Sequence, residues 1–211
     1  VQLRQFENEA NPRAHYRTTA EEILEQVEGR EIDAFVAGVG TGGTLSGNAR
    51  RLREEFPEMT VVAVEPEENA VLSTGESGDD DFQGMGPGFV SPNLDRDLID
   101  DVETVNVETA EAECRRLARE EGILVGQSSG ASNVAAKRVA ERIAKPGAEC
   151  PPAGTGEPRR PVDDHDQERV DAGGAAASAG RDAGEDCPLV VTVYWDSGER
   201  YLSTGLFDAA E

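Results

Sequence analysis

The sequence predicts an α/β fold in which a parallel sheet is flanked by helices. Two short apolar segments, residues 33–39 and 60–66, have the length and borders of buried strands. Between them, residues 45–55 have the apolar spacing of a helix. Strand, helix and strand of these lengths form a βαβ unit, whose two strands are parallel neighbours joined by a right-handed crossover.

A helix is also predicted before the first strand. Thr18 and Thr19, each followed three residues later by a glutamate, form overlapping capping boxes, and the helix is expected to end near Gly29. The chain begins with Val1 rather than methionine, and its first residues predict no complete element. We therefore expect a piece of a longer protein, truncated at its N-terminus.

Later segments continue the α/β pattern. A strand is predicted over residues 102–107, followed by a helix over 110–122 that Thr109 can cap. Residues 123–132 are typical of a strand that leads through a small-residue turn into a helix ending near residue 144. Because ligands of open parallel sheets bind at the carboxyl ends of strands, such turns indicate a binding site.

The chain is expected to have three parts. Residues 1–145 form an α/β cofactor-binding domain, and residues 146–187, rich in proline, glycine, alanine and charge without apolar period, form a linker or disordered insertion. Residues 188–211 complete the same domain with a strand over 188–195 and a closing helix over 199–207.

The composition is strongly acidic. Acidic residues number 43 against 20 basic ones, a formal net charge of −23, and only Lys137 and Lys145 are lysines. This polyanion would repel nucleic acid and acidic membranes, and it is typical of salt-adapted, halophilic proteins. No apolar run reaches the ~20 residues of a membrane span, no signal peptide opens the chain, and its three cysteines indicate neither disulfides nor a metal site. A cytoplasmic protein is predicted.

A glycine cluster follows the first predicted strand. Gly38, Gly40 and Gly43 satisfy G-x-G-x-x-G, and Glu65 ends the next strand where a dinucleotide site needs an acid for the ribose. A nicotinamide enzyme is therefore one interpretation. Thr41 and Thr44 add two hydroxyls to the same turn, which also suits one compact phosphate monoester at a helix N-terminus.

Five segments occur here in one order: "QFENEANPRAHYRTTAEEI", "GVGTGGTLSG", "GMGPGF", "EEGILVGQSSGAS" and "DSGERYLST". The series resembles the C-terminal half of cysteine synthase (O-acetylserine sulfhydrylase), a transferase of the pyridoxal-phosphate (PLP) β-replacement family. It covers residues 5–144 and 188–207. The resemblance implies the large cofactor-binding domain of a tryptophan-synthase-β-like PLP enzyme. It also implies cysteine biosynthesis from O-acetylserine and sulfide, in a full-length homodimer.

The resemblance also assigns site residues. It places the cofactor phosphate on Gly40, Thr41, Gly42, Gly43 and Thr44. Ser128 would contact the pyridine nitrogen, although Ser128 and Ser129 could equally cap the following helix. Gln5 would lie near the substrate carboxylate, and Gly84 would line the site. His15 and His165 are expected to be surface residues.

One group of the family is missing. PLP chemistry needs a lysine amine to form a Schiff base with the cofactor, and neither Lys137 nor Lys145 matches that position. No catalytic residue is therefore assigned, and the chain alone is expected to be inactive. Tyr194 and Trp195 also stand where relatives tend to have leucine and proline. A cystathionine β-synthase-like enzyme and a non-catalytic phosphate-binding relic remain alternatives.

Overall fold

The computed structural model describes residues 2–27, 29–146 and 187–208. The chain divides into two compact units, residues 1–143 with 188–211, and residues 144–187. The helices and strands described below belong to the first unit. The predicted linker, residues 146–187, lies outside the described residues except at its two ends.

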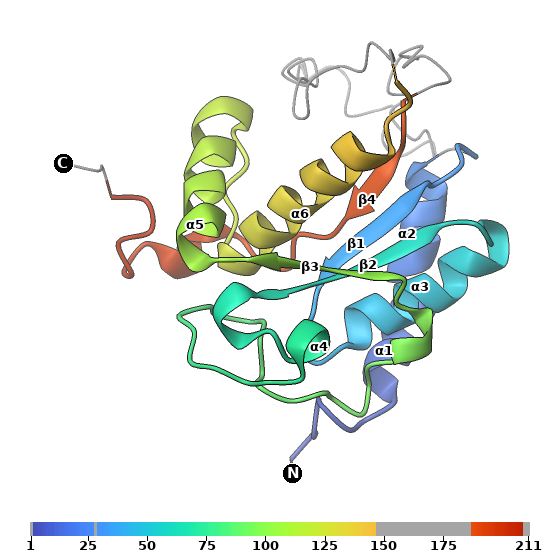
Figure 1. Cartoon of the computed structure of the whole chain (residues 1–211), viewed down its shortest axis with the longest axis horizontal. Helices are drawn as coiled ribbons and strands as arrows, with labels where there is room; N and C mark the ends of the chain where they lie inside the picture. The colour runs from blue at the N-terminus through green and yellow to red at the C-terminus, as the bar shows by residue number, and fades with distance from the viewer. Residues whose placement is uncertain (1, 28, 147–186, 209–211) are drawn as a thin grey trace, which may run out of the picture. The chain divides into compact units, whose positions relative to one another are not determined.

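A four-stranded parallel sheet forms the centre of the first unit (Figure 1). Its strands are β1 (Ala34–Gly38), β2 (Thr60–Pro66), β3 (Asp101–Val105) and β4 (Val190–Thr192). They lie in the order β3-β2-β1-β4, with Val36 of β1 opposite Val62 of β2 and Thr192 of β4. The predicted parallel sheet and its βαβ unit are confirmed.

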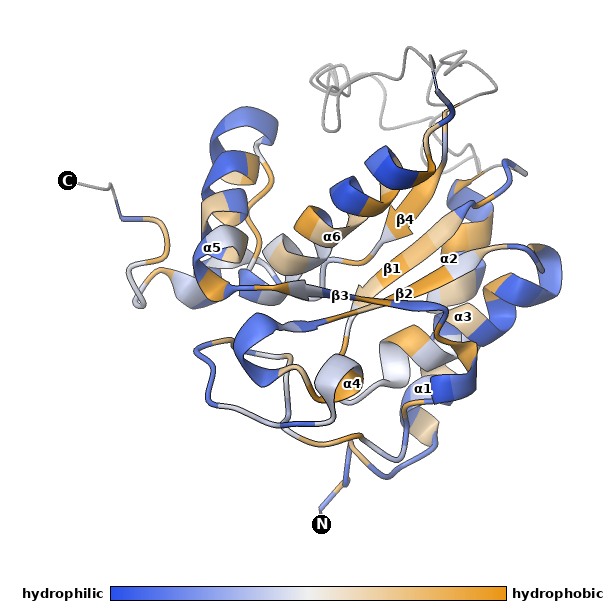
Figure 2. Cartoon of the chain, in the orientation of Figure 1, coloured by the Kyte–Doolittle hydropathy of each residue, from blue (hydrophilic) through white to orange (hydrophobic). Residues whose placement is uncertain are grey.

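Helices cover both faces of this sheet. They are α1 (Ala10–Arg17), α2 (Thr19–Gln26), α3 (Gly43–Glu55), the short α4 (Val71–Thr74), α5 (Val107–Arg116) and α6 (Gln127–Ile143). Phe35 and Ala37 of β1 pack in one apolar cluster with α2 and α3, whereas Ala34 and Val36 pack in another with α6. Because side chains alternate along a strand, β1 is buried on both faces, and Figure 2 shows it in apolar colours.

The N-terminal helices differ from the prediction. Residues Ala10–Arg17 form a helix that the sequence did not indicate, and α2 ends at Gln26 rather than near Gly29. Thr18 does not cap α2, because its hydroxyl donates to the Ala14 carbonyl 2.8 Å away in α1. A residue between two consecutive helices can satisfy the end of the first instead of the start of the second.

The cap of α5 was also predicted wrongly. The helix begins at Val107, and the Asn106 side chain accepts a 2.9 Å hydrogen bond from the Thr109 N–H. Thr109 is therefore the capped residue and not the cap. Asparagine is among the best N-cap residues because its short side chain reaches an unpaired backbone donor of the first turn.

The strand predicted at the start of residues 123–132 does not form in the described structure. Val125 makes only an isolated antiparallel bridge with Ser197, and α6 begins directly at Gln127. Tyr201 packs so closely on Gly126 that a Cβ there would lie 2.2 Å from its ring. Val125 and Gly126 therefore pack against C-terminal residues and do not join the sheet.

The C-terminal elements are shorter than expected. The last strand spans only Val190–Thr192, and Gly198–Tyr201 forms a 3₁₀ turn in place of the predicted helix over 199–207. Tyr201 and Leu206 are both buried in the same cluster. Their spacing of five residues does not put them on one face of an α-helix, which favours an irregular course.

Two cysteines lie in the described residues. Cys114 is a buried free thiol that donates to the Gly126 carbonyl at 3.2 Å, and burial raises its pKa to about 12. Cys187 is disulfide-bonded, so the expectation of no disulfide is wrong. None of the helices in the described ranges is long and apolar enough to cross a membrane.

Candidate cofactor-binding site

The turn between β1 and α3 depends on glycine. Gly42 is the N-cap of α3 and has a φ of +80°, which side chains rarely adopt. A Cβ on Gly42 would lie 2.7 Å from the Cβ of Leu94, and one on Gly40 would lie 2.5 Å from the Gly84 carbonyl. The backbone of this turn is therefore fixed by close packing against the loop that contains Gly84 and Leu94.

Backbone donors gather at the same turn. The Ser46 N–H makes the first helical bond, to Gly42 O at 3.0 Å, and the Gly43 N–H makes a long 3.4 Å bond to the Thr41 hydroxyl. The N–H groups of Thr44 and Leu45 have no partner among the residues that the structure describes. Unpaired amides and the positive end of the helix dipole make this turn suitable for an anion.

The Thr41 hydroxyl keeps its proton for a ligand. The Asn11 side-chain amide donates to Thr41 Oγ1 at 2.8 Å, and with the long bond from the Gly43 N–H this oxygen accepts two hydrogen bonds. Asn11 also donates to the Gln5 carbonyl at 2.9 Å, and Asn93 donates to the same carbonyl at 2.9 Å. These two asparagines hold the segment around Gln5 beside the turn.

Thr44 has two neighbours that the sequence did not indicate. The Trp195 indole donates to Thr44 Oγ1 at 3.0 Å, and His15 Nε2 lies 3.2 Å from the same oxygen. His15 is half-buried and its pKa is lowered by desolvation, so the expectation of a surface residue is wrong for His15. The four-residue spacing of Asn11 and His15 on α1 is the sequence signal that could have placed both near the turn.

The first turn of α6 approaches from the other side. Ser129 Oγ accepts a hydrogen bond from the backbone N–H of Trp195 at 3.2 Å. Ser132 Oγ accepts one from the backbone N–H of Gly38, also at 3.2 Å. The Ser128 hydroxyl has no hydrogen-bond partner in the described part of the chain, and a Cβ on Gly84 would lie 3.6 Å from it. Ser128 is therefore available to a ligand rather than occupied in capping the helix.

A pocket of about 740 Å³ lies where these segments meet. Of the predicted site residues, Gln5, Gly40, Thr41, Gly42, Thr44, Gly84 and Ser128 line it. Gly43 does not, and a Cβ there would lie 2.0 Å from the Asn11 side chain. The sequence missed Asp196, which also lines the pocket. Its Oδ2 accepts from the Tyr201 hydroxyl at 2.7 Å, whereas its buried Oδ1 has no partner among the described residues.

The pocket fits the phosphate and the ring nitrogen of PLP, but it provides no amine. None of the residues that line it is a lysine. Lys137 belongs to α6, and its Nζ lies 3.4 Å from Glu113 Oε1 of α5. The cation among the lining residues is Arg200. An arginine cannot replace a lysine as the covalent partner of PLP, because its guanidinium stays protonated.

The structure does not support a dinucleotide site. Glu65 is 3% exposed, and its carboxylate accepts from the backbone N–H groups of Leu72 and Ser73 at 2.7 and 2.8 Å. It also accepts from the Ser73 hydroxyl. Glu65 thus satisfies the start of α4, and its oxygens are not free to bind a ribose.

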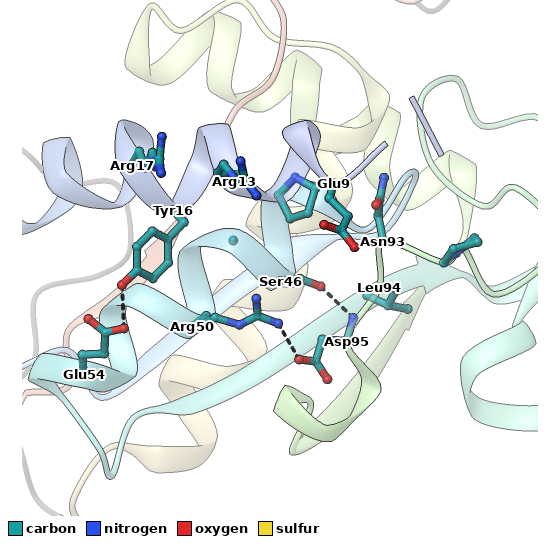
Figure 3. A pocket seen from close by; sticks show the side chains of 13 residues that line it. Glu9, Arg13, Tyr16, Arg17, Ser46, Arg50, Glu54, Asn93, Leu94 and Asp95 are labelled. Carbon is teal, nitrogen blue, oxygen red and sulfur yellow. Dashed lines mark hydrogen bonds and ion pairs between the residues drawn. The ribbon is translucent and has the colours of Figure 1, made fainter. Parts of the chain in front are cut away.

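A second cavity of about 670 Å³ lies along α1 and α3 (Figure 3). Arg50 pairs there with Asp95 at 2.8 Å, and Tyr16 donates to Glu54 at 2.7 Å. Its lining residues include none of the predicted site residues. They carry equal numbers of guanidinium and carboxylate groups, from Arg13, Arg17, Arg50, Glu9, Glu54 and Asp95. Charge therefore does not favour an anionic cofactor in this groove.

Comparisons with known proteins agree with the pocket. A curated cysteine synthase of Staphylococcus aureus is 50% identical over 141 residues, which is 67% of this chain and 46% of that protein. The chain thus spans about half the length of this relative.

Solved structures show the same relationship. An O-ureido-L-serine synthase has a TM-score of 0.74 and 38% identity, covering 99% of this chain and 53% of its own. A cysteine synthase from Entamoeba histolytica has a TM-score of 0.73 and 31% identity, and the match covers 98% of this chain and 49% of that protein. The model of the family "Pyridoxal-phosphate dependent enzyme" matches residues 1–148. The chain belongs to the family of pyridoxal-phosphate-dependent enzymes.

Proposed function

We propose that this chain is the cofactor-binding part of a cysteine synthase, which makes cysteine from O-acetylserine and sulfide. The observation that carries the proposal is a single pocket. It is lined by residues of the Gly40–Thr44 turn together with Ser128, Gly84 and Gln5. The 50% identity to a cysteine synthase supports this activity over a cystathionine β-synthase-like one.

Each part of the pocket has a proposed role. The amides at the start of α3 and the hydroxyls of Thr41 and Thr44 bind the phosphate group. Ser128 donates to the ring nitrogen, and as a neutral hydroxyl it does not protonate that nitrogen. When bound, PLP supplies a conjugated ring that withdraws electrons from the substrate. Gln5, held by Asn11 and Asn93, orients the substrate carboxylate.

The missing lysine sets a limit on this chain alone. We infer that it binds PLP noncovalently and weakly, and that turnover needs an amine that these residues do not supply. Backbone NMR during titration with PLP should shift the Gly42–Thr44 amides, whereas pyridoxal without phosphate should leave them unchanged. Treatment with borohydride, which makes a Schiff base between PLP and a lysine permanent, should leave no PLP covalently attached in the pocket. Equal shifts with both compounds, or none with either, would refute the phosphate site.

A non-catalytic phosphate-binding relic is the second candidate, and the absence of a lysine from the pocket lining favours it. In that case inorganic phosphate should raise the melting temperature by mass action. Adding the part of a relative that this chain does not span should then produce no turnover. For the cysteine synthase, this addition should restore cysteine formation.

We also propose a cytoplasmic location, from the composition, and a homodimeric full-length enzyme, from the resemblance. The three-part division at residues 145 and 187 is likewise a proposal. It is supported by the compact unit that joins residues 1–143 to residues 188–211.

A further inference from the structure

Four side chains form a line of polar contacts that ends at the pocket. His15 Nδ1 lies 3.1 Å from Thr19 Oγ1, and His15 Nε2 lies 3.2 Å from Thr44 Oγ1. Trp195 Nε1 lies 3.0 Å from the same Thr44 oxygen. Thr44 lines the 740 Å³ pocket, so a change in these hydrogen bonds alters what the Thr44 hydroxyl can offer to a ligand there.

The protons in this line can be counted. An indole N–H only donates, so Thr44 Oγ1 accepts from Trp195 and has one acceptor site and one proton left. If the His15 proton is on Nε2, it fills the second acceptor site, and the Thr44 proton must point elsewhere. If that proton is on Nδ1, Thr44 donates to Nε2 and offers no proton to the pocket.

The Nε2–H arrangement suits a phosphate at the turn. Thr19 can then donate to Nδ1, Thr44 accepts twice, and its own proton is free for a phosphate oxygen, so every group in the line is satisfied. Desolvation lowers the pKa of His15, which favours the neutral ring. The position of the single imidazole proton, rather than the charge of the ring, then decides what Thr44 offers.

We propose that His15 is a positioning residue whose Nε2–H tautomer directs the Thr44 hydroxyl proton into the pocket toward a phosphate group. This inference rests on the proposed function, because it takes the Gly40–Thr44 turn as the phosphate site. By linkage, a phosphate that prefers this tautomer also stabilises it. His15 therefore affects phosphate binding without touching the phosphate.

The tautomer can be read directly by NMR. In the full chain with ¹⁵N-labelled histidine, the two ring nitrogens give distinct shifts, and a His165→Gln variant assigns the other histidine. Inorganic phosphate is titrated while the Gly42–Thr44 amides are followed. We expect His15 to hold Nε2–H in the bound state. Moving amides with Nδ1–H at His15 would overturn this inference alone, and unmoved amides would overturn it together with the phosphate site.

Variants give a second, independent readout. His15→Gln keeps an amide donor near the position of Nε2, whereas His15→Leu removes it. In His15→Leu the Thr44 hydroxyl loses the donor that fixes its orientation, so its hydrogen bond to the phosphate should weaken and phosphate binding should fall on the order of tenfold. His15→Gln should recover most of this loss. Trp195, the single tryptophan, reports binding by its fluorescence.

The matched control is Tyr16→Phe, which removes a hydrogen bond to Glu54 from the same helix without touching the turn. It should bind phosphate as the parent chain does. Unchanged binding in His15→Leu, or equal weakening in His15→Gln and His15→Leu, would overturn the inference. The tautomer measurement uses the unmodified histidine and remains decisive if a variant fails to fold.

Discussion

The Trp195 indole donates a 3.0 Å hydrogen bond to the Thr44 hydroxyl, and the two residues are 151 positions apart. The Trp195 ring also packs on β1, where a Cβ on Gly38 would lie 3.3 Å from it. The C-terminal segment therefore packs directly against the glycine turn.

Trp195→Phe tests this contact. The phenyl ring retains most of the packing but has no N–H, so we expect a loss of about 1 kcal/mol in the free energy of unfolding. Urea denaturation measures it. Tyr194→Phe is the neighbouring control, because its hydroxyl bond to Asn133 is exposed and should contribute less. An equal loss in both variants would mean that the indole hydrogen bond contributes no more to the free energy of unfolding than the exposed Tyr194 bond.

Gly42→Ala should destabilise the turn more than Gly75→Ala. Both glycines have a φ of +80°, but a Cβ on Gly75 meets nothing within 4 Å, whereas one on Gly42 meets Leu94. The backbone strain of about 1 kcal/mol is common to both, and the clash adds on the order of 2 kcal/mol at Gly42 only. Thermal unfolding of both variants should show this difference, and equal values would contradict the packing seen here.

Glu113→Gln should lower stability by about 1–3 kcal/mol at neutral pH. Burial tends to raise the pKa of this carboxyl, but hydrogen bonds from Arg116 and Asn133 and the charge of Lys137 outweigh it, so the pKa lies below its ordinary value. Its contribution is therefore present above the pKa of the unfolded chain and is lost as the pH falls through the folded-state pKa.

Denaturant titrations at neutral and acidic pH check this prediction. The gap between the parent chain and Glu113→Gln should narrow in acid. Glu7→Gln is the control, because Glu7 and its partner Arg4 are 61% and 69% exposed and such a pair contributes little. A gap that does not depend on pH would show that the amide disturbs packing rather than charge.

Potassium chloride should raise the melting temperature. A net charge of −23 on 211 residues repels itself, and salt screens this repulsion within a Debye length of about 10 Å at 0.1 M and about 3 Å at 1 M. Calorimetry between these concentrations should show a steady rise. A flat or falling curve would contradict the expected salt adaptation.

The sequence predicted the elements whose own residues decide their structure. The strands at residues 34–38 and 60–66 are short, apolar and buried on both faces, so local composition and burial agree. The glycine turn was predictable for the same reason, since its conformation excludes side chains at Gly42.

Failures occurred where distant contacts decide. Residues 123–126 are apolar enough for a strand, but Tyr201 packs on Gly126 and Ser197 pairs with Val125. No local pattern predicts the burial of His15, because its partner, Thr44, is 29 positions away. The role of Trp195 is likewise not predictable, since no local pattern shows which donor reaches Thr44.

The order of strands in the sheet has a consequence for the order in which the chain folds. Strands β1, β2 and β3 come from residues 34–105, whereas β4 pairs with β1 through only three residues, such as Val191 with Phe35. Closing so long a loop for so short a ladder is entropically costly, so β4 should dock late in folding. Because β4 leads directly to Trp195, we expect the hydrogen bond from Trp195 to Thr44 to form last, after most of the protein is already native.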